Sequence, residues 1–543
     1  MRNINLRYVE EKYDENGIIT EYKLKYPSNY NFGYDIVDDI AINDPTRKAL
    51  IWCNPAGEER IYTFADIKRL SDKAANYLTS LGIKKGDPVM VVLKRNYQFW
   101  YVSVALCKIG AIMIPATFML KKHDVEYRVR SASVKATICT HQNDVTQAFD
   151  LAEDVPTLEK KIITGEKRDG WLDFDEGVEK ASDKWERIPT KVTEPMLMYF
   201  SSGTSGYPKM VLHDHLYSLG HLFTAKHWHC IEPDGLHLTI ADTGWGKAVW
   251  GKLYGQWMME ACVFAYDYDK FVPSDILDLI SKYKITTLCC PPTMFRFFIN
   301  DGLEGHDLSS LKHTTIAGEA LNPDVFYNWY KATGLKLMEG FGQTETTVVI
   351  CCTNNMEPKP GSMGKPSPQY TVDIVDENGK SCPPGASGEI VVRADPKPEG
   401  LMIGYYRDPE KTIETVYDGW HHTGDIAWKD EDGYYWFVGR KDDVIKSSGY
   451  RISPFEIESV LINHSAVQEC AITGVPDDVR GQLVKATIVL KKGYDPTDAL
   501  RKELQDYVKH ETAPYKYPRA VEFVKELPKT INGKIMRSAI RKG

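Results

Sequence analysis

The chain has 543 residues, of which 43% are hydrophobic and 26% charged, and its formal net charge is −8. This length exceeds what one hydrophobic core usually serves, so at least two domains are expected. A net negative charge without a block of Lys and Arg argues against a nucleic-acid groove, which needs a basic stripe.

Predicted helices and strands alternate along most of the first 340 residues. Residues 63–82 have the apolar spacing of an amphipathic helix, which Thr63 and Asp66 would cap. Further helices are predicted at 97–109, 274–283 and 323–333, and strands at 89–93, 111–114, 136–139, 161–164, 196–200, 286–290 and 335–339. Strands that alternate with helices form βαβ units, so we expect an α/β fold with largely parallel sheets.

The later part of the chain has a different pattern of predicted secondary structure. Short strands and Pro/Gly turns at residues 362–393 predict a β-rich subdomain. Beyond Arg440, a capped helix start at residues 453–456 is followed by a mixture of strands and one helix, which predicts a small α+β domain. We therefore predict a large N-terminal domain over residues 1–441 and a small C-terminal domain over residues 442–543.

Cysteine spacing and hydropathy indicate where in the cell the protein is expected. The eleven cysteines include two adjacent pairs and no C-x-x-C spacing, which predicts reduced, mostly buried thiols. The N-terminus lacks the apolar core of a secretory signal. Residues 100–120 are apolar but contain Lys108 and Pro115, so we interpret them as a buried helix and a strand. We expect a cytoplasmic protein without a membrane span.

A loop of small and hydroxyl residues follows the predicted strand at 196–200. Glycine lets backbone N–H groups approach an anion closely, and a lysine after Pro208 adds positive charge. The loop has neither the P-loop nor the dinucleotide glycine spacing, and the alternative is an ordinary Ser/Gly turn. We predict a polyphosphate site there. Its residues would be Ser202, Gly203, Thr204, Ser205, Gly206 and Lys209.

Five further blocks follow that loop along the chain. They read Glu-Gly-Phe-Gly-Gln-Thr-Glu at 339–345, His-Thr-Gly-Asp at 422–425, Gly-Arg-Lys-Asp-Asp at 439–443, Ser-Gly-Tyr-Arg at 448–451 and Asn-Gly-Lys at 532–534. In this order the blocks resemble the adenylate-forming superfamily, and within it the medium-chain branch of the acyl-CoA synthetases. The resemblance implies that a carboxylic acid is coupled to AMP from ATP, with release of pyrophosphate, and is then transferred to CoA.

The resemblance also implies roles for residues around ATP. Glu345 would bind Mg²⁺, which is often shared between carboxylate and phosphate oxygens. Thr344 would donate to the α-phosphate, and Phe341 would offer a flat face to adenine. The implied adenine-edge and ribose contacts are Gly318, Glu319, Ala320, Asp425 and Arg440.

Four residues of the C-terminal blocks take roles from the same resemblance. Lys534 would bridge the substrate carboxylate and the α-phosphate, and Arg451 would meet phosphate in the adenylation state. Gly449 would line the path of the CoA pantetheine. Asp442 matches the hinge, at about residues 441–443, on which a mobile C-terminal domain turns between half-reactions.

The acid pocket is expected near Gly342. Members restricted to acetate carry tryptophan at that position, so glycine predicts a deeper pocket that admits a longer or branched acid, each buried methylene contributing about 0.8 kcal/mol. Trp245 or Trp250 would wall the pocket, with plain core packing as the alternative. Six histidines between His213 and His237 lack the cysteine or carboxylate pattern that would complete a zinc site.

Two alternatives to an acyl-CoA synthetase stay open. An adenylating enzyme could load the thiol of a carrier protein, although the sequence shows no fused carrier domain, which favours CoA. A nucleotide-binding regulator could have lost catalysis, although binding alone would not require Lys534 beside Glu345 and Asp425. The expected partners are thus a small carboxylic acid, ATP and CoA.

Overall fold

The computed structural model describes residues 3–142, 144–201, 207–319, 321–448, 450–529 and 535–542. The chain forms two compact units. The first comprises Met1–Pro360, Gly364–Thr371 and Arg393–Gly419, and the second comprises Gly361–Met363, Val372–Val392 and Trp420–Gly543. This division does not test the hinge at residues 441–443, which stays a prediction.

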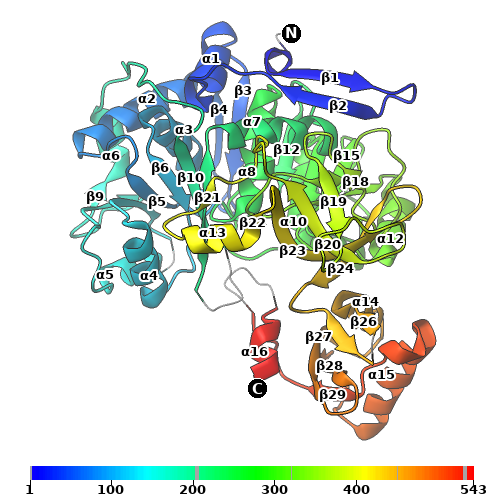
Figure 1. The fold of residues 1–543 in the computed structure, drawn as a ribbon. Coiled ribbons are helices and arrows are strands. Elements are labelled where there is room, and N and C mark those ends of the chain that lie inside the picture. Colours follow the sequence, from blue (N-terminus) through cyan, green and yellow to red (C-terminus); the bar gives the residue numbers. More distant parts are fainter. Residues whose placement is uncertain are drawn as a thin grey trace. The chain divides into compact units, whose positions relative to one another are not determined.

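The first unit contains an eight-stranded sheet in the order β21-β11-β10-β6-β5-β7-β8-β9, surrounded by helices (Figure 1). Its parallel strands are β5 (Pro88–Val92), β6 (Ile112–Pro115), β7 (Ala136–Thr140), β8 (Lys160–Thr164), β9 (Leu172–Asp173) and β10 (Pro195–Ser201). Antiparallel strands β11 (Lys209–Asp214) and β21 (Gly404–Tyr405) complete the edge beyond β10. The accompanying helices are α2 (Phe64–Ser80), α3 (Gln98–Ile109), α4 (Lys122–Ala132), α5 (Val145–Asp150) and α6 (Phe174–Lys180).

A second sheet of the same unit has nine strands in the order β18-β17-β16-β15-β14-β12-β13-β3-β4. Its parallel strands are β3 (Lys48–Cys53), β12 (Leu236–Thr239), β13 (Cys262–Tyr266), β14 (Thr287–Cys290), β15 (His313–Ile316) and β16 (Leu337–Phe341). The antiparallel strands are β4 (Glu59–Thr63), β17 (Ile350–Cys351) and β18 (Lys365–Pro366). The α/β fold with largely parallel sheets is confirmed, and Glu345 follows the carboxyl end of β16, where such sheets bind ligands.

The remaining elements of the first unit join or border these sheets. Near the N-terminus, β1 (Val9–Tyr13) and β2 (Ile19–Leu24) form an antiparallel hairpin. The helices are α1 (Asp39–Asn43), α7 (Leu216–Phe223), α8 (Gly246–Lys252), α9 (Tyr254–Met258), α10 (Pro273–Tyr283), α11 (Pro292–Asp301), α12 (Pro323–Thr333) and α13 (Pro409–Thr415). The other elements are η1 (Ile4–Arg7), β1 (Val9–Tyr13), β2 (Ile19–Leu24), η2 (Gly33–Asp38), η3 (Thr224–Trp228) and β22 (Val416–Tyr417).

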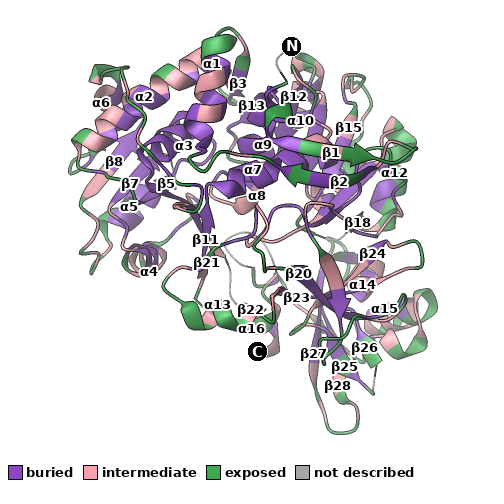
Figure 2. Cartoon of the chain, turned by 45° about the horizontal axis from the view of Figure 1, so that its top comes forward, coloured by how far each residue is buried: buried purple, intermediate pink, exposed green. Residues whose placement is uncertain are grey.

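Capping residues explain where α2 begins, and the apolar or polar sequence of an element agrees with its burial. Thr63 caps α2 and forms the predicted reciprocal pair with Asp66. Every residue of α3 is buried, which explains its apolar run. Figure 2 shows the central strands as buried, whereas α13 has no buried residue. Within the described ranges, no helix combines the length and apolarity that a membrane crossing requires.

The second unit contains the predicted β-rich part and an α+β part. The first has antiparallel strands β19 (Val372–Val375), β20 (Gly388–Arg393), β23 (Trp420–Lys429) and β24 (Tyr435–Arg440). The α+β part has strands β25 (Ile445–Ser447), β26 (Tyr450–Ile452), β27 (Val467–Asp477), β28 (Gly481–Leu490) and β29 (Ala520–Phe523). Its helical segments are α14 (Pro454–Leu461), α15 (Asp498–Glu511), η4 (Pro514–Lys516) and α16 (Arg537–Lys542). As predicted, Ser453 caps α14 by accepting from the Glu456 N–H.

A buried ion pair ties the two sheets of the first unit together. Lys94, which follows β5, places Nζ 3.0 Å from Oδ1 of Asp267, which follows β13. The two side chains are only 2% and 1% exposed. The Lys94 carbonyl also accepts from the Thr243 N–H at 3.2 Å. Loops from both sheets are thus joined at their carboxyl edges, where the candidate site lies.

We expect Lys94→Met to destabilise the first unit strongly. The substitution leaves the buried Asp267 carboxylate without its ammonium, and breaking a buried pair in this way typically costs about 3–5 kcal/mol. The comparison is Lys312→Met, which removes an exposed pair with Glu232 and should cost about 0–1 kcal/mol. Thermal and urea unfolding of the full chain would measure both. Equal losses of unfolding free energy in the two variants would contradict a larger contribution from the buried pair.

Glu339 on β16 is a buried acid beneath the turn that carries Glu345. It is 4% exposed, and its Oε2 has no hydrogen-bond partner among the described residues. Burial raises the pKa of Glu339 from 4.5 to about 8, against the effect of a hydrogen bond from the Leu321 backbone N–H. The folded protein therefore holds this carboxyl protonated near neutral pH.

We expect Glu339→Gln to become increasingly stabilising, relative to the natural residue, as pH rises. Between about pH 5 and 8 the folded chain keeps a proton on Glu339 that the unfolded chain releases, so the free energy of unfolding falls with rising pH. Glutamine does not titrate and escapes this loss. Melting temperatures of both proteins at pH 5, 6, 7 and 8 would measure the difference. A difference that stays constant across the window would contradict the raised pKa.

Candidate active site

The turn after β16 carries Thr344 and Glu345, and two distant segments hold it. The Thr344 carbonyl accepts a hydrogen bond from Nε2 of His213 at 2.8 Å. The Glu345 carbonyl accepts from the Met402 N–H at 2.8 Å. A carbonyl oxygen can only accept, so Nε2 of His213 must carry the proton. The turn is therefore anchored through the carbonyls of two consecutive peptide groups.

Tyr405 connects the carboxylate of Glu345 with the loop lysine Lys209. Its hydroxyl donates to Oε1 of Glu345 at 2.9 Å. The Lys209 ammonium lies 5.2 Å from the centroid of the same ring, within the range of a cation–π interaction. The register of β11 and β21, which pairs Val211 with Tyr405, brings the ring to Lys209. A predicted metal ligand and a predicted phosphate contact thus meet one tyrosine.

His213 is a neutral support for this turn. Burial lowers the pKa of His213 to about 3, although the hydrogen bond to Thr344 opposes the shift. The imidazole stacks on Tyr217 with ring centroids 3.8 Å apart. In the part of the chain that the structure describes, no three His, Cys, Asp or Glu side chains form a metal-binding group. The neutral imidazole of His213 donates its hydrogen bond to the Thr344 carbonyl.

The predicted adenine-edge segment follows β15 and meets α8. Gly318 has a φ of +97°, a conformation that favours glycine. The Ala317 carbonyl accepts from Nζ of Lys247 at 2.6 Å, and Thr293 donates to Oε2 of Glu319 at 2.7 Å. At the start of α8, a Cβ added to Gly246 would lie 4.0 Å from Thr344 side-chain atoms. The end of β15, α8 and the Thr344 turn therefore converge.

The predicted acid pocket contains a tightly packed tryptophan. A Cβ added to Gly342 would lie 2.4 Å from Cη2 of Trp250 and 2.3 Å from the Thr347 carbonyl oxygen. Trp250 is 7% exposed and packs edge-on against Trp228, with ring centroids 6.2 Å apart. Trp245 precedes α8, and its Nε1 has no hydrogen-bond partner among the described residues. The space left by Gly342 is occupied by the Trp250 indole.

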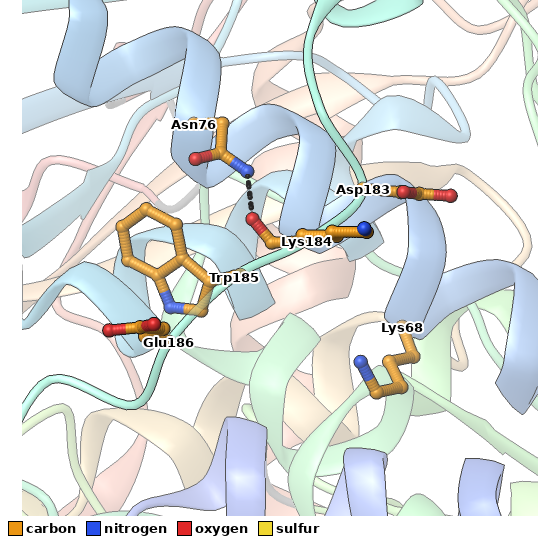
Figure 3. A pocket seen from close by; sticks show the side chains of 6 residues that line it. All are labelled: Lys68, Asn76, Asp183, Lys184, Trp185 and Glu186. Carbon is orange, nitrogen blue, oxygen red and sulfur yellow. Dashed lines mark hydrogen bonds between the residues drawn. The ribbon is translucent and has the colours of Figure 1, made fainter.

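Two hollows of the first unit lie outside this set of residues. Figure 3 shows one of about 640 Å³, in which Asn76 donates to the Lys184 carbonyl at 2.9 Å. It is lined by Lys68, Asn76, Asp183, Lys184, Trp185 and Glu186. The other, of about 470 Å³, includes Arg47, Asp234 and Glu260 in its lining. No predicted site residue lines either hollow, so the candidate site rests on side-chain geometry.

In the second unit, the predicted ribose residues face each other on adjacent strands. Asp425 of β23 is in register with Arg440 of β24, and Nη1 of Arg440 lies 3.2 Å from Oδ1 of Asp425. The same Nη1 donates to the Thr423 carbonyl at 3.0 Å. Asp425 is 4% exposed. The structure thus brings these two predicted residues together.

The connector residues are tied to neighbours within the second unit. Nζ of Lys441 lies 3.0 Å from Oε2 of Glu389. Burial tends to raise the pKa of Glu389, but hydrogen bonds from His422 and Lys441 hold it at about 2. The Asp442 carbonyl accepts from Nη1 of Arg541 at 3.1 Å. These contacts anchor both the charged connector and the predicted hinge residue.

The other predicted C-terminal residues divide into described and undescribed ones. Arg451 on β26 donates to Oε1 of Glu377 at 2.6 Å, and the two side chains are 39% and 71% exposed. Several predicted site residues lie outside the described ranges, so the geometry above does not include them. They are Ser202, Gly203, Thr204, Ser205, Gly206, Ala320, Gly449 and Lys534.

Sequence patterns did not identify Tyr405. It lies on a two-residue strand, 60 residues beyond Glu345, and belongs to none of the recognised blocks. No periodicity marks it, because its importance arises from the pairing of β21 with β11. In the sequence, His213 is only one of six histidines that lack a zinc-binding pattern. Its contact with Thr344, 131 residues away, has no local signal.

Known protein families account for most of the chain. A model of the AMP-binding enzyme family matches residues 37–406, and a model of the AMP-binding enzyme C-terminal domain matches residues 456–534. Human acyl-coenzyme A synthetase ACSM3, mitochondrial, is 42% identical over 535 residues, which cover 96% of this chain and 91% of the relative. Human acyl-coenzyme A synthetase ACSM5, mitochondrial, is 42% identical over 526 residues, covering 95% and 90%.

These relatives contradict the expectation of a cytoplasmic protein. Both are named as mitochondrial, which points to mitochondria instead. Ten of the eleven cysteines are buried, which agrees with the prediction of mostly buried thiols, whereas their reduced state stays a prediction. Free thiols nevertheless do not identify one compartment. An apolar signal core marks only secreted proteins, since mitochondrial transit peptides are amphipathic and Arg-rich.

Solved structures share the architecture. The crystal structure of the anthranilate CoA ligase AuaEII in complex with anthranoyl-AMP is 31% identical, with a TM-score of 0.86, covering 95% of this chain and 98% of that one. The acyl-CoA synthetase of Brucella canis is 30% identical, with a TM-score of 0.72, covering 94% of both chains. The resemblance inferred from the sequence blocks is confirmed: this chain belongs to the AMP-binding enzyme family.

Proposed function

We propose that this protein is an ATP-dependent acyl-CoA synthetase for a medium-length or branched carboxylic acid. The acid carboxylate attacks the α-phosphorus of ATP and releases pyrophosphate, and the CoA thiol then attacks the acyl carbonyl and releases AMP. The observation that carries this proposal is the anchored Thr344–Glu345 turn beside Lys209. Family membership and relatives named acyl-coenzyme A synthetases support the reaction class.

The groups around the turn suit a magnesium-bound polyphosphate. Glu345 supplies carboxylate oxygens, the ligands that Mg²⁺ accepts together with phosphate oxygens. Lys209 supplies positive charge near the same tyrosine. Bound Mg²⁺ would neutralise phosphate charge. Glu345 would hold the ion, Thr344 would donate to the α-phosphate, and Phe341 would face adenine.

Other residues take proposed roles one by one. Gly318, Glu319 and Ala320 would contact the adenine edge. Asp425 would accept from the ribose hydroxyls, a role supported by its burial beside the Arg440 guanidinium. The Asp425 carboxylate can accept at both oxygens, whereas the Arg440 guanidinium would contact the ribose only as a donor.

The thioester half-reaction requires a second set of contacts. Gly449 would line the pantetheine path, and a side chain there would obstruct the thiol. Asp442 would act as the hinge of a mobile C-terminal domain, with the boundary at residues 441–443. Arg451 would meet phosphate during adenylation. Its exposed partner Glu377 can be displaced at low cost, because such surface pairs contribute little.

The proposed activity predicts acid-dependent ATP–pyrophosphate exchange in the absence of CoA. Across a ladder of straight and branched acids, exchange should peak beyond acetate. Adding CoA should then yield acyl-CoA and AMP, as mass spectrometry would show. Exchange without any thioester on CoA would favour the carrier-protein alternative. ATP binding without exchange for any acid would favour the non-catalytic alternative.

The same ladder tests whether Trp250 limits the pocket. Trp250→Ala should move the preferred acid to longer chains, because each newly buried methylene contributes about 0.8 kcal/mol, or about fourfold in kcat/KM. Trp171→Ala is the matched control, since Trp171 is similarly buried at 8% exposure but packs in a different core cluster, just before β9. An unchanged acid preference in Trp250→Ala would remove Trp250 from the pocket wall.

Lys534→Ala separates the two half-reactions. We expect adenylation to fall by about 10²–10³, because a preorganised donor for the carboxylate and α-phosphate is lost. Thioester formation from supplied acyl-AMP should persist. Lys529→Ala, which removes a lysine paired with Glu469 at 2.8 Å, is the control and should affect neither step. Equal loss of both half-reactions in Lys534→Ala would refute the assigned role.

A further inference from the structure

We propose that Tyr405 is a positioning residue that orients the Glu345 carboxylate for the metal-bound polyphosphate. This inference rests on the proposed function, in which Glu345 holds Mg²⁺. Tyr405 itself would touch neither the metal nor the substrate. It would act by holding one carboxylate oxygen, which fixes the plane of the group and the direction of the other oxygen.

The hydrogen bond between the two side chains has a defined direction. An ionised carboxylate only accepts, so the Tyr405 hydroxyl donates to Oε1 of Glu345 across 2.9 Å. A glutamate in a turn can otherwise rotate about three side-chain torsions. A donor on one oxygen removes most of that freedom, and the resulting preorganisation is what binding of a geometrically demanding ion requires.

Tyr405 can impose a direction because its own position is fixed. Its side chain belongs to a small apolar cluster with Val211 and Met402, and it is 6% exposed. Its backbone N–H donates to Oγ1 of Thr412 at 2.9 Å. Met402, three residues earlier, donates its N–H to the Glu345 carbonyl at 2.8 Å. The segment that carries Tyr405 therefore holds both the backbone and the side chain of Glu345.

The face of the same ring contacts Lys209. The ammonium lies 5.2 Å from the ring centroid, where the aromatic quadrupole attracts a cation. The hydroxyl and the ring face are chemically separable, because phenylalanine keeps the face and lacks the hydroxyl. Tyr405→Phe therefore removes the link to Glu345 and preserves the contact with Lys209.

The test is calorimetric binding of ATP to the full chain, with Mg²⁺ and, separately, with EDTA. For Tyr405→Phe we expect Mg·ATP to bind about tenfold more weakly, the usual consequence of losing a hydrogen bond to a charged group. Metal-free ATP should bind as it does to the unchanged protein. The control is Tyr406→Phe, at the next residue, whose ring lies under the Arg407 guanidinium. That variant should bind Mg·ATP and metal-free ATP as tightly as the unchanged protein does.

A double-mutant cycle with Glu345→Ala distinguishes positioning from general packing. If Tyr405 acts through Glu345, Tyr405→Phe should have no further effect once the carboxylate is absent. An equal loss for Mg·ATP and metal-free ATP, or a loss that persists beside Glu345→Ala, would overturn the inference. Failure of the unchanged protein to prefer Mg·ATP would overturn the metal role of Glu345 and this inference together. A metal preference that Tyr405→Phe preserves would overturn the inference alone.

Discussion

Parallel pairing of β15 with β16 is the constraint on which the candidate site of the first unit depends. The register aligns Ile316 with Glu339, so both strands end at the same edge of the sheet. Gly318 and the Thr344–Glu345 turn leave the sheet together at that edge. A slip of one residue would reverse the faces of all following side chains. The buried Lys94–Asp267 pair then joins this sheet to its neighbour close to the loops that border the site.

Around the turn, burial keeps two ionisable groups neutral. The pKa of His213 falls to about 3 and that of Glu339 rises to about 8, in each case mainly because burial disfavours the charged form. Both groups are thus uncharged near neutral pH. In the proposed function, neither His213 nor Glu339 would add a charge that competes with Glu345 and Lys209 for the ligand. Fixed, uncharged neighbours favour preorganisation of the charged groups that would bind the ligand.

Glycine and tryptophan are complementary along β16 and the turn after it. Positions 340 and 342 are separated by one residue, and each lacks a side chain where an indole approaches. A Cβ on Gly340 would lie 2.4 Å from Trp228, and one on Gly342 would lie 2.4 Å from Trp250. The two indoles pack edge-on against each other, so Trp228 supports Trp250. The glycines therefore have a packing requirement besides any role in substrate size.

The sequence by itself determined the α/β class, the capped starts of α2 and α14, and the family. It also located Glu345 beyond a strand end. These features are readable because capping, strand periodicity and motif spacing are local in the chain. Only the tertiary structure decided that Tyr405 holds Glu345, that His213 holds Thr344, and that Trp250 fills the space at Gly342. Those contacts join segments brought together by sheet pairing and core packing, which leave no periodic mark in either segment.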